Sequence, residues 1–564
     1  MAVFAELRDG TGARSYTGAL HEPQVGVLFG EPFGDSLITD GERQPSAITI
    51  YVSFEHESLP QRVHVDLHTN YTMHGYNLAD YSMIQIAWNF IYEGNSLAGV
   101  LNQRAMITEA ARYLGGLDAP ILLRVGAEMN EWPIPADPAE FVAAFRFIAG
   151  IMREYAPNVA MVYAVNSVSA IGLDWMMFYP GEEYVDWVGI SLYTTRYFLG
   201  NPDTTHTNAM VFRTGEYANP VQKMRELVEM FGHKHPLLIS EGAVSVYNLQ
   251  NREDLTEWAL PHMRAVYSYI PMLFPEVKAI FWFNVPMYTY ERGGNQRYDF
   301  YTSPAALDLY RELTAQEHFI GRGQNQAAVT YRRLGTAAMP ANEVVLLTYA
   351  PFFNHNDFIE VQYWLDGVMI GYSRDIPYRQ TFDMSAMADG THYLLVRILN
   401  HGQLLQSKEL VLIKNGCIVQ ITDDLVRLTN IAEAVPSAHN VLVNGTPTSF
   451  RAFNIGDNNF FMLRDIAYVL NGTPSNFQVG WDGNVSLTTG AAYTPVGGEM
   501  QPATTEAMQA TPSQAHVFIN GQFFNLRAYT IGDNNFFMLR DLGIALGFGV
   551  DWDSAASAVL IYTN

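Results

Sequence analysis

The sequence predicts a multidomain protein that begins with a (β/α)8 barrel and continues into two smaller β-rich parts. The chain has 564 residues, which at roughly 150 residues per domain corresponds to three or four domains. Short β-branched or aromatic runs alternate with helical stretches up to about residue 320, the pattern of repeated β/α units. The pattern then changes to alternating strands with Asp-Gly and Asn-Gly turns.

The barrel is predicted by eight strand-like runs. They lie at residues 25–30, 47–54, 83–90, 121–126, 159–166, 185–193, 236–241 and 277–284. Between them, segments such as 138–156 repeat apolar residues at the spacing of an amphipathic helix. Eight such units need roughly 250 residues plus loops, which assigns the TIM barrel to residues 1–322. An open doubly wound sheet is the alternative that this alternation allows.

The second part, residues 323–415, is predicted to be a β-sandwich because it has strand patterns and no long helical one. Its segment YWLDGVMIGYS, which starts at Tyr363, and the strand pattern that follows resemble bacterial immunoglobulin-like modules. The resemblance implies a spacer, with sugar binding as the alternative.

The third part, residues 416–564, contains an internal duplication. The segment IGDNNFFMLRD begins at Ile455 and again at Ile531, and a Trp-Asp pair follows each copy. This part resembles the N-terminal, stalk-domain repeat of copper amine oxidases, which implies a duplicated α+β module that is structural or faces the cell envelope. Copper itself is not expected, because His439 and His516 are its only histidines.

Composition excludes several classes of function. The 33 basic and 57 acidic residues give a net charge of −24, which disfavours nucleic acids and anionic membranes as partners. A single cysteine, Cys417, excludes an intrachain disulfide. The sequence has no phosphate-binding loop, no H-E-x-x-H motif and no transmembrane-length apolar run. We therefore expect no cofactor and no metal. A signal peptide is not visible at the start of the chain.

Two carboxylates follow predicted barrel strands. Glu128 follows the fourth strand and Glu241 ends the seventh, and barrel active sites lie at these carboxyl ends. A lone glutamate at a strand end is more often a solvated surface residue, but a facing pair is what retaining glycoside hydrolysis requires. Tyr193, at the end of the sixth strand, lies where it could hydrogen-bond Glu241, and Trp282 on the eighth strand could form the floor of a sugar subsite.

Four segments resemble clan A glycoside hydrolases, and within that clan most closely glycoside hydrolase family 26. They are EMNEW from Glu128, YPGEEYVDWVGISLY from Tyr179, PLLISEG from Pro236 and VKAIFWFN from Val277. The resemblance implies that Glu128 is the acid/base, that Glu241 is the nucleophile and that Tyr193 supports it. It makes sugar-stacking candidates of three tryptophans, Trp88, Trp132 and Trp282. Asn166 either contacts the sugar or caps a turn.

The activity implied by the resemblance is a retaining endo-β-glycanase acting on β-1,4-mannan or a related plant β-glycan, in a secreted or cell-surface bacterial protein. The family usually has His directly before the acid/base glutamate, whereas this chain has Ala127. That departure keeps a second hypothesis open, a catalytically weak or inactive carbohydrate-binding protein. The expected partner is a polysaccharide in either case, with the cell envelope as a further partner of the C-terminal module.

Overall fold

A computed structural model describes most of the chain. It leaves out residues 9–11, 33–36, 39–41, 55–57, 75–77, 90–96, 131–136, 168–174, 199–200, 203–214, 216–217, 285–295, 336–337, 353–356, 424–430, 457, 482, 503, 514, 516, 521, 525, 554–555 and 564.

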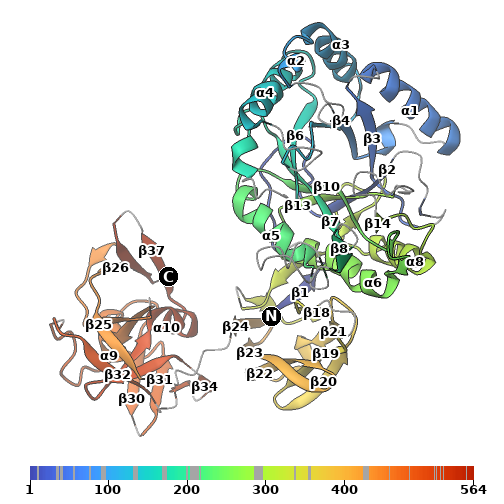
Figure 1. The fold of residues 1–564 in the computed structure, drawn as a ribbon. Helices are drawn as coiled ribbons and strands as arrows, with labels where there is room; N and C mark the ends of the chain where they lie inside the picture. The colour runs from blue at the N-terminus through green and yellow to red at the C-terminus, as the bar shows by residue number, and fades with distance from the viewer. Residues whose placement is uncertain are drawn as a thin grey trace.

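Eight parallel strands close into a barrel, which confirms the fold expected for the first part of the chain (Figure 1). In sheet order they are β2 (Val27–Pro32), β3 (Ala47–Ser53), β4 (Met83–Asn89), β5 (Ile121–Val125), β6 (Val159–Asn166), β7 (Trp187–Thr194), β10 (Leu237–Val244) and β13 (Val277–Trp282). The pairing of Ala279 in β13 with Leu28 in β2 closes the ring. A short strand, β15 (Phe319–Ile320), pairs with the beginning of β2.

Helices surround the barrel (Figure 1). They are α1 (Leu59–His74), α2 (Leu97–Val100), α3 (Arg104–Gly115), α4 (Pro138–Tyr155), α5 (Pro220–Phe231), α6 (Thr256–Arg264), α7 (Ile270–Leu273) and α8 (Pro304–Thr314). Three of them start with the same device, a capping side chain followed by proline. Asp137 accepts from the Glu140 amide at 2.9 Å before α4, and Asn219 and Ser303 cap α5 and α8 in the same way.

Alternate residues of the barrel strands face opposite sides. One set forms a small buried cluster at the barrel axis, which includes Leu28, Met83, Leu122 and Leu238. The other set packs outward into the large cluster shared with the helices, which includes Ile86, Leu123 and Ile239. This period of two decides which side chains reach the mouth of the barrel.

The second part consists of two antiparallel sheets. One contains β16 (Thr330–Arg333), β1 (Ala2–Leu7), β18 (Glu343–Tyr349) and β21 (Arg379–Asp383). The other contains β17 (Met339–Pro340), β24 (Ile418–Asp423), β23 (Gln403–Asn415), β22 (Gly390–Asn400), β19 (Ile359–Leu365) and β20 (Val368–Ser373). The hydroxyls of Thr348 and Tyr363, one from each sheet, lie 2.8 Å apart. The first strand of the chain therefore belongs to this second part, whereas the sequence pattern assigned it to the barrel.

The third part is built from both copies of the repeat. Its closed six-stranded barrel contains β25 (Ala432–Pro436), β28 (Ala452–Ile455), β29 (Asn458–Met462), β36 (Asn534–Met538), β35 (Ala528–Ile531) and β32 (Met508–Pro512). Phe461 pairs with Phe537, its equivalent in the other copy, so the two halves are related by an approximate twofold axis.

The two repeats also exchange strands. In parallel pairs, β26 (Asn440–Val443) from the first copy joins β38 (Ala558–Tyr562) from the second, while β33 (Val517–Ile519) joins β31 (Val485–Thr489). Helices α9 (Leu463–Val469) and α10 (Leu539–Leu546) follow the repeated strands. Because each half completes the other, neither repeat is an independent folding unit.

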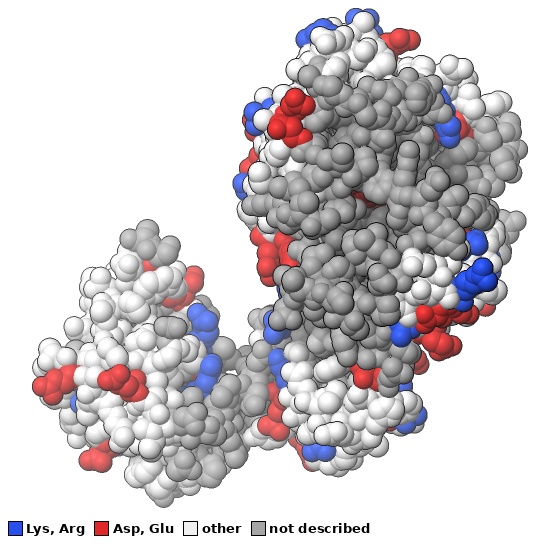
Figure 2. Space-filling model, in the orientation of Figure 1, with Lys and Arg blue, Asp and Glu red and all other residues white. Residues whose placement is uncertain are grey.

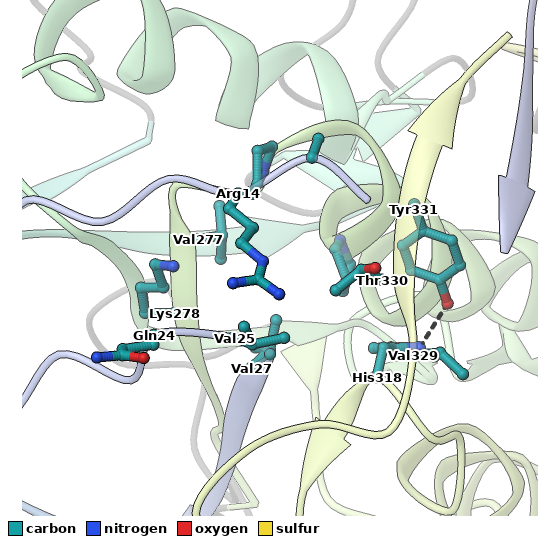
Figure 3. A pocket seen from close by; sticks show the side chains of 14 residues that line it. Arg14, Gln24, Val25, Val27, Val277, Lys278, His318, Val329, Thr330 and Tyr331 are labelled. Atoms are coloured by element: carbon teal, nitrogen blue, oxygen red, sulfur yellow. Dashed lines mark hydrogen bonds between the residues drawn. The ribbon is translucent and has the colours of Figure 1, made fainter. Parts of the chain in front are cut away.

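A small cavity of about 40 Å³ lies at the amino ends of β2 and β13, the face opposite the one expected to hold the active site (Figure 3). His318 lines it and is fully enclosed by its partners, since its Nε2 lies 2.9 Å from the Tyr267 carbonyl and the Tyr331 hydroxyl lies 2.8 Å from its Nδ1. Burial lowers the pKa of His318 from 6.5 to about 3. The ring is therefore neutral in the folded protein.

This buried imidazole predicts an acid-sensitive stability. Below about pH 6.5 the unfolded chain binds a proton at His318 that the folded chain does not, so the free energy of unfolding falls as the pH decreases toward about 3. The contribution is at most about 1.4 kcal/mol per pH unit. Urea unfolding of the protein and of a His318→Gln variant between pH 7 and pH 4 measures it. We expect a shallower slope in the variant; equal slopes would contradict the assignment.

Candidate active site

Glu128 and Glu241 both lie at the carboxyl ends of the barrel strands. Glu128 follows β5 and is 8% exposed, and its amide donates to the Ala164 carbonyl of β6 at 3.0 Å. Its φ angle is +63°, a left-handed conformation that costs energy in a residue with a side chain. The neighbouring β6 strand thus holds Glu128 in a backbone conformation that few residues adopt.

A β-bulge turns Glu241 toward the barrel axis. Leu238 of β10 belongs to the axial cluster, so strict alternation would point residue 241 outward, toward the helices. However, Ile239 pairs with Ile190 and Glu241 pairs with Ser191, which makes Ser240 an extra residue. The extra residue reverses the alternation, as bulges beside active sites do.

Gln85 in β4 anchors this bulge from across the barrel. Its side chain is fully buried, and its Nε2 donates to the Ser240 carbonyl at 2.8 Å and to the Thr49 hydroxyl at 2.9 Å. The carbonyl of an extra residue loses its normal ladder partner, so an internal donor is needed. Gln85 supplies it.

Replacing Gln85 with methionine is expected to loosen the bulge. The Ser240 carbonyl would lose a buried donor, at a cost of about 1–3 kcal/mol in the free energy of unfolding. Because Glu241 would then be less firmly placed, we expect kcat to fall about tenfold or more. Chemical denaturation and steady-state kinetics measure both quantities. A loss of stability with unchanged kcat would show that Gln85 does not position Glu241.

Three donors converge on the carboxylate of Glu241. The Arg124 Nη1 donates to Oε2 at 2.6 Å, the Tyr193 hydroxyl donates to Oε1 at 2.5 Å and the Tyr51 hydroxyl donates to Oε2 at 3.2 Å. Arg124 is 1% exposed, and its Nη2 donates to the Ser191 hydroxyl at 2.8 Å. The arrangement fixes the rotamer of Glu241 and matches its negative charge with a buried guanidinium.

The two tyrosines remain donors at any pH the protein tolerates. Burial raises the pKa of Tyr193 well above 10, and the negative charges of Glu241 and Glu128 raise it further. Burial and the charge of Glu241 likewise raise the pKa of Tyr51, with a smaller contribution from Glu128. Both tyrosines thus donate to Glu241, and the charge of Glu128 acts on both of them.

Aromatic rings line this space. The ring of Tyr193 lies 5.0 Å from that of Tyr298 and 5.8 Å from that of Phe283, and Phe283 also contacts Tyr51 at 6.5 Å. Burial raises the pKa of Tyr298, and the charge of Glu128 adds to the shift. Tyr51, Tyr193, Phe283 and Tyr298 therefore form an aromatic surface beside Glu241.

Two of the tryptophans expected to stack on sugar lie elsewhere. Trp282 is 2% exposed, and its ring stacks on Phe300 at 4.7 Å in the outer cluster. Trp88 is 1% exposed and packs against Phe54. Both side chains point outward from their strands, toward the helices. Neither indole face is available to a ligand, so the expectation that these two tryptophans stack on sugar is wrong. Trp132 lies outside the described residues.

Asn166 lies beside the loop that carries Glu128. The backbone amide of Asn166 donates to the side-chain Oδ1 of Asn130 at 2.8 Å, and the side-chain Nδ2 of Asn130 donates to the backbone carbonyl of Asn166 at 3.0 Å. These bonds join the loop that carries Glu128 to the end of β6. A sugar contact by the Asn166 side chain stays a prediction. Ala127 is buried in the axial cluster, so it brings no polar group to the mouth.

Sequence reasoning missed Arg124, Tyr51 and Asn130. Arg124 had a readable signal, because a charged residue inside the apolar run ILLRV needs a buried acidic partner. Tyr51 had none, since aromatic residues are common in strands. Among the described residues, no group of three or more His, Cys, Asp or Glu side chains is arranged to hold a metal ion. Within the same residues, no helix is long and apolar enough to cross a membrane.

Comparisons with known proteins give only distant similarities. No protein-family model and no curated protein matches the chain. Among solved structures, a GH26 β-mannanase from Bacteroides ovatus is 13% identical, with 54% of this chain and 93% of that chain covered and a TM-score of 0.36. GH26C from Muricauda sp. is 12% identical over 54% and 88%, with a TM-score of 0.39. A Cellulomonas fimi endo-β-1,4-mannanase double mutant is 13% identical over 68% and 94%, with a TM-score of 0.33. At these scores the functional assignment rests on the site itself.

Proposed function

We propose that the barrel is a retaining glycoside hydrolase in which Glu128 is the acid/base and Glu241 the nucleophile. The observation that carries the proposal is the pair of environments at the barrel mouth. Glu241 is held by Arg124 and two phenolic hydroxyls, as an ionised nucleophile requires. Glu128 follows a different strand, β5, at the same end of the barrel, where it is 8% exposed and its amide is held by the Ala164 carbonyl of β6.

In the first step, an oxygen of Glu241 attacks the anomeric carbon while Glu128 gives its proton to the glycosidic oxygen. The leaving sugar departs as an alcohol, and a covalent glycosyl ester with Glu241 remains. In the second step, Glu128, now ionised, takes a proton from water, whose oxygen attacks the same carbon and releases Glu241. Two inversions give net retention of configuration.

The substrate we propose is β-1,4-mannan or a related plant β-glycan, cleaved internally, by an enzyme that acts outside the cell or at its surface. The family resemblance of the Glu128 and Tyr193 segments supports this choice. The aromatic surface of Tyr51, Tyr193, Phe283 and Tyr298 offers apolar ring faces, to which the C–H face of a pyranose can bind.

Retention is tested by the anomeric configuration of the first product. We expect NMR spectra recorded within minutes of mixing with glucomannan, galactomannan, xylan or mixed-linkage glucan to show the β anomer before mutarotation. Retention also requires the two carboxyl groups to lie about 5–5.5 Å apart. Early appearance of the α anomer would instead indicate an inverting enzyme and contradict the nucleophilic role of Glu241.

Ala127 favours a second candidate, a barrel that binds a glycan without cleaving it. A polar residue at this position would contribute hydrogen bonds to the sugar or to the nucleophile, and the buried alanine contributes neither. Prolonged incubation with the same polysaccharides discriminates the two. Binding with no product on any of them would support the second candidate.

A further inference from the structure

The C-terminal module contains a large groove that the barrel chemistry does not involve. Its volume is about 820 Å³, within the range of sites for small ligands. It lies between the end of β30 (Phe477–Trp481), the start of α9, and the strands β32, β35 and β36. Both copies of the repeat contribute to its walls, because β30 and α9 follow the first copy and β35 and β36 belong to the second.

The approximate twofold axis predicts a second, equivalent groove beside β37 (Gly549–Asp553). The frame is the same in both halves, since Ser513 donates to Asn535 at 2.9 Å in one and Ser437 donates to Asn459 at 3.1 Å in the other. The two halves differ at several positions of the wall, such as Thr530 and Thr511, whose counterparts are Asn454 and Val435. One of these differences removes a ring. With the repeat offset of 76 residues, His439 in one half corresponds to Ala515 in the other.

In one half, a histidine ring packs on the tryptophan and leaves it partly exposed. The rings of His439 and Trp552 lie 4.8 Å apart and meet edge to face, and Trp552 is 42% exposed. In the other half, Ala515 takes the place of the histidine and has no ring. The equivalent indole, Trp481, is 57% exposed and lines the open groove. The open groove is thus the place that an imidazole occupies in the other half.

Polar groups surround the exposed indole. Asn535 Oδ1 accepts from the hydroxyls of Ser513 and Thr530, at 2.9 and 3.2 Å, which turns the Nδ2 of that amide away from them. Arg464 and Asn534 also line the groove. Figure 2 shows that charged side chains are few and scattered on the visible face of this module. The lining therefore combines one apolar ring face with hydroxyl and amide groups and with two side chains of opposite charge, Arg464 and Asp533.

We propose that this groove binds a sugar unit of a polysaccharide chain. The C–H face of a pyranose would lie on the indole of Trp481, and its hydroxyls would pair with Asn535, Ser513 and Arg464. A sugar needs this mixture of an aromatic platform and amide or hydroxyl partners, whereas a purely apolar ligand would leave the polar groups unpaired. The site is independent of the barrel and does not require it to be an active enzyme.

The test measures retention of the full-length protein by glycans, in a Glu241→Gln background so that no substrate is consumed. The probes are soluble glucomannan, xylan and mixed-linkage glucan in affinity gels, and insoluble peptidoglycan in a pull-down. We expect Trp481→Ala to weaken retention about tenfold or more on at least one probe. Ala515→His is expected to have the same effect, because it rebuilds the ring that fills the other half. A plant glycan or peptidoglycan as the responsive probe identifies the source of the sugar.

Trp552→Ala is the matched control, since it removes the equivalent indole from the half in which His439 packs on it. This variant should leave retention unchanged. Binding by the barrel is common to all variants, so the differences report on the groove alone. Melting curves check that each variant is folded, and Trp481 is exposed enough for its removal to be tolerated. Equal retention of the parent, Trp481→Ala and Ala515→His on every probe would overturn the proposal. So would an equal loss in Trp481→Ala and Trp552→Ala.

Discussion

Replacing Glu241, the proposed nucleophile, with alanine is expected to lower kcat on any substrate by on the order of 10⁴-fold or more, the scale at which removal of a nucleophile acts. The variant lacks the atom that forms the covalent intermediate, while Arg124, Tyr193 and Tyr51 remain to hold an anion in the vacated space. Added azide or formate should therefore bind there and partly restore turnover, with inverted configuration in the product. Steady-state kinetics and NMR of the product measure both effects.

Glu128→Ala is the matched control for this prediction. It should also abolish cleavage of polysaccharide, but an aryl glycoside with a good leaving group needs no proton in the first step. We therefore expect a burst of released phenol from Glu128→Ala and none from Glu241→Ala. Undiminished turnover in Glu241→Ala would remove Glu241 from the mechanism, and identical behaviour of the two variants on the aryl glycoside would contradict the division of roles.

The barrel could be predicted from sequence because its strands are buried on both faces and read as compact apolar runs. Each of the eight predicted runs overlaps a strand of the structure, from β2 to β13. The first strand of the chain was harder to place. Its partners, β16 and β18, lie more than three hundred residues away, and local patterns carry no information about such distant pairing.

Within the site, the alternation of side chains along a strand and the pairing register between strands determine which residues reach the barrel mouth. The sequence shows the alternation but not the register. Glu241 reaches the barrel mouth only because Ser240 is bulged, and simple alternation would have turned it outward. Trp282 shows the opposite case, since its position at the end of β13 gives no warning that it packs on Phe300. Family resemblance pointed to Glu241 as a site candidate without any knowledge of the bulge, but it could not determine where the indole points.

The repeat was evident in the sequence, but the exchange of strands between its copies was not. Two identical segments predict two equal units, each closing on itself. In the structure, β26 completes its sheet with β38 from the other copy. The difference between His439 and Ala515 can be interpreted only with this arrangement, because residues of both copies line the groove.

Arg124→Met is the second substitution with a large expected effect. Arg124 is 1% exposed and lies 2.6 Å from Glu241, whose side chain is 12% exposed. Methionine would leave a nearly buried carboxylate without its cation, and removing one partner of such a pair costs about 3–5 kcal/mol in the free energy of unfolding. We expect kcat to fall by about 10²-fold or more, because the carboxylate would lose a donor that fixes its rotamer.

A second variant separates the charge from the shape of the side chain. In Arg124→Met combined with Glu241→Gln, no unpaired charge remains at this place, so most of the lost stability should return although activity does not. Urea unfolding of the parent, both single variants and the double variant gives the coupling free energy between the two residues. A coupling free energy near zero would show that the guanidinium does not stabilise the carboxylate of Glu241.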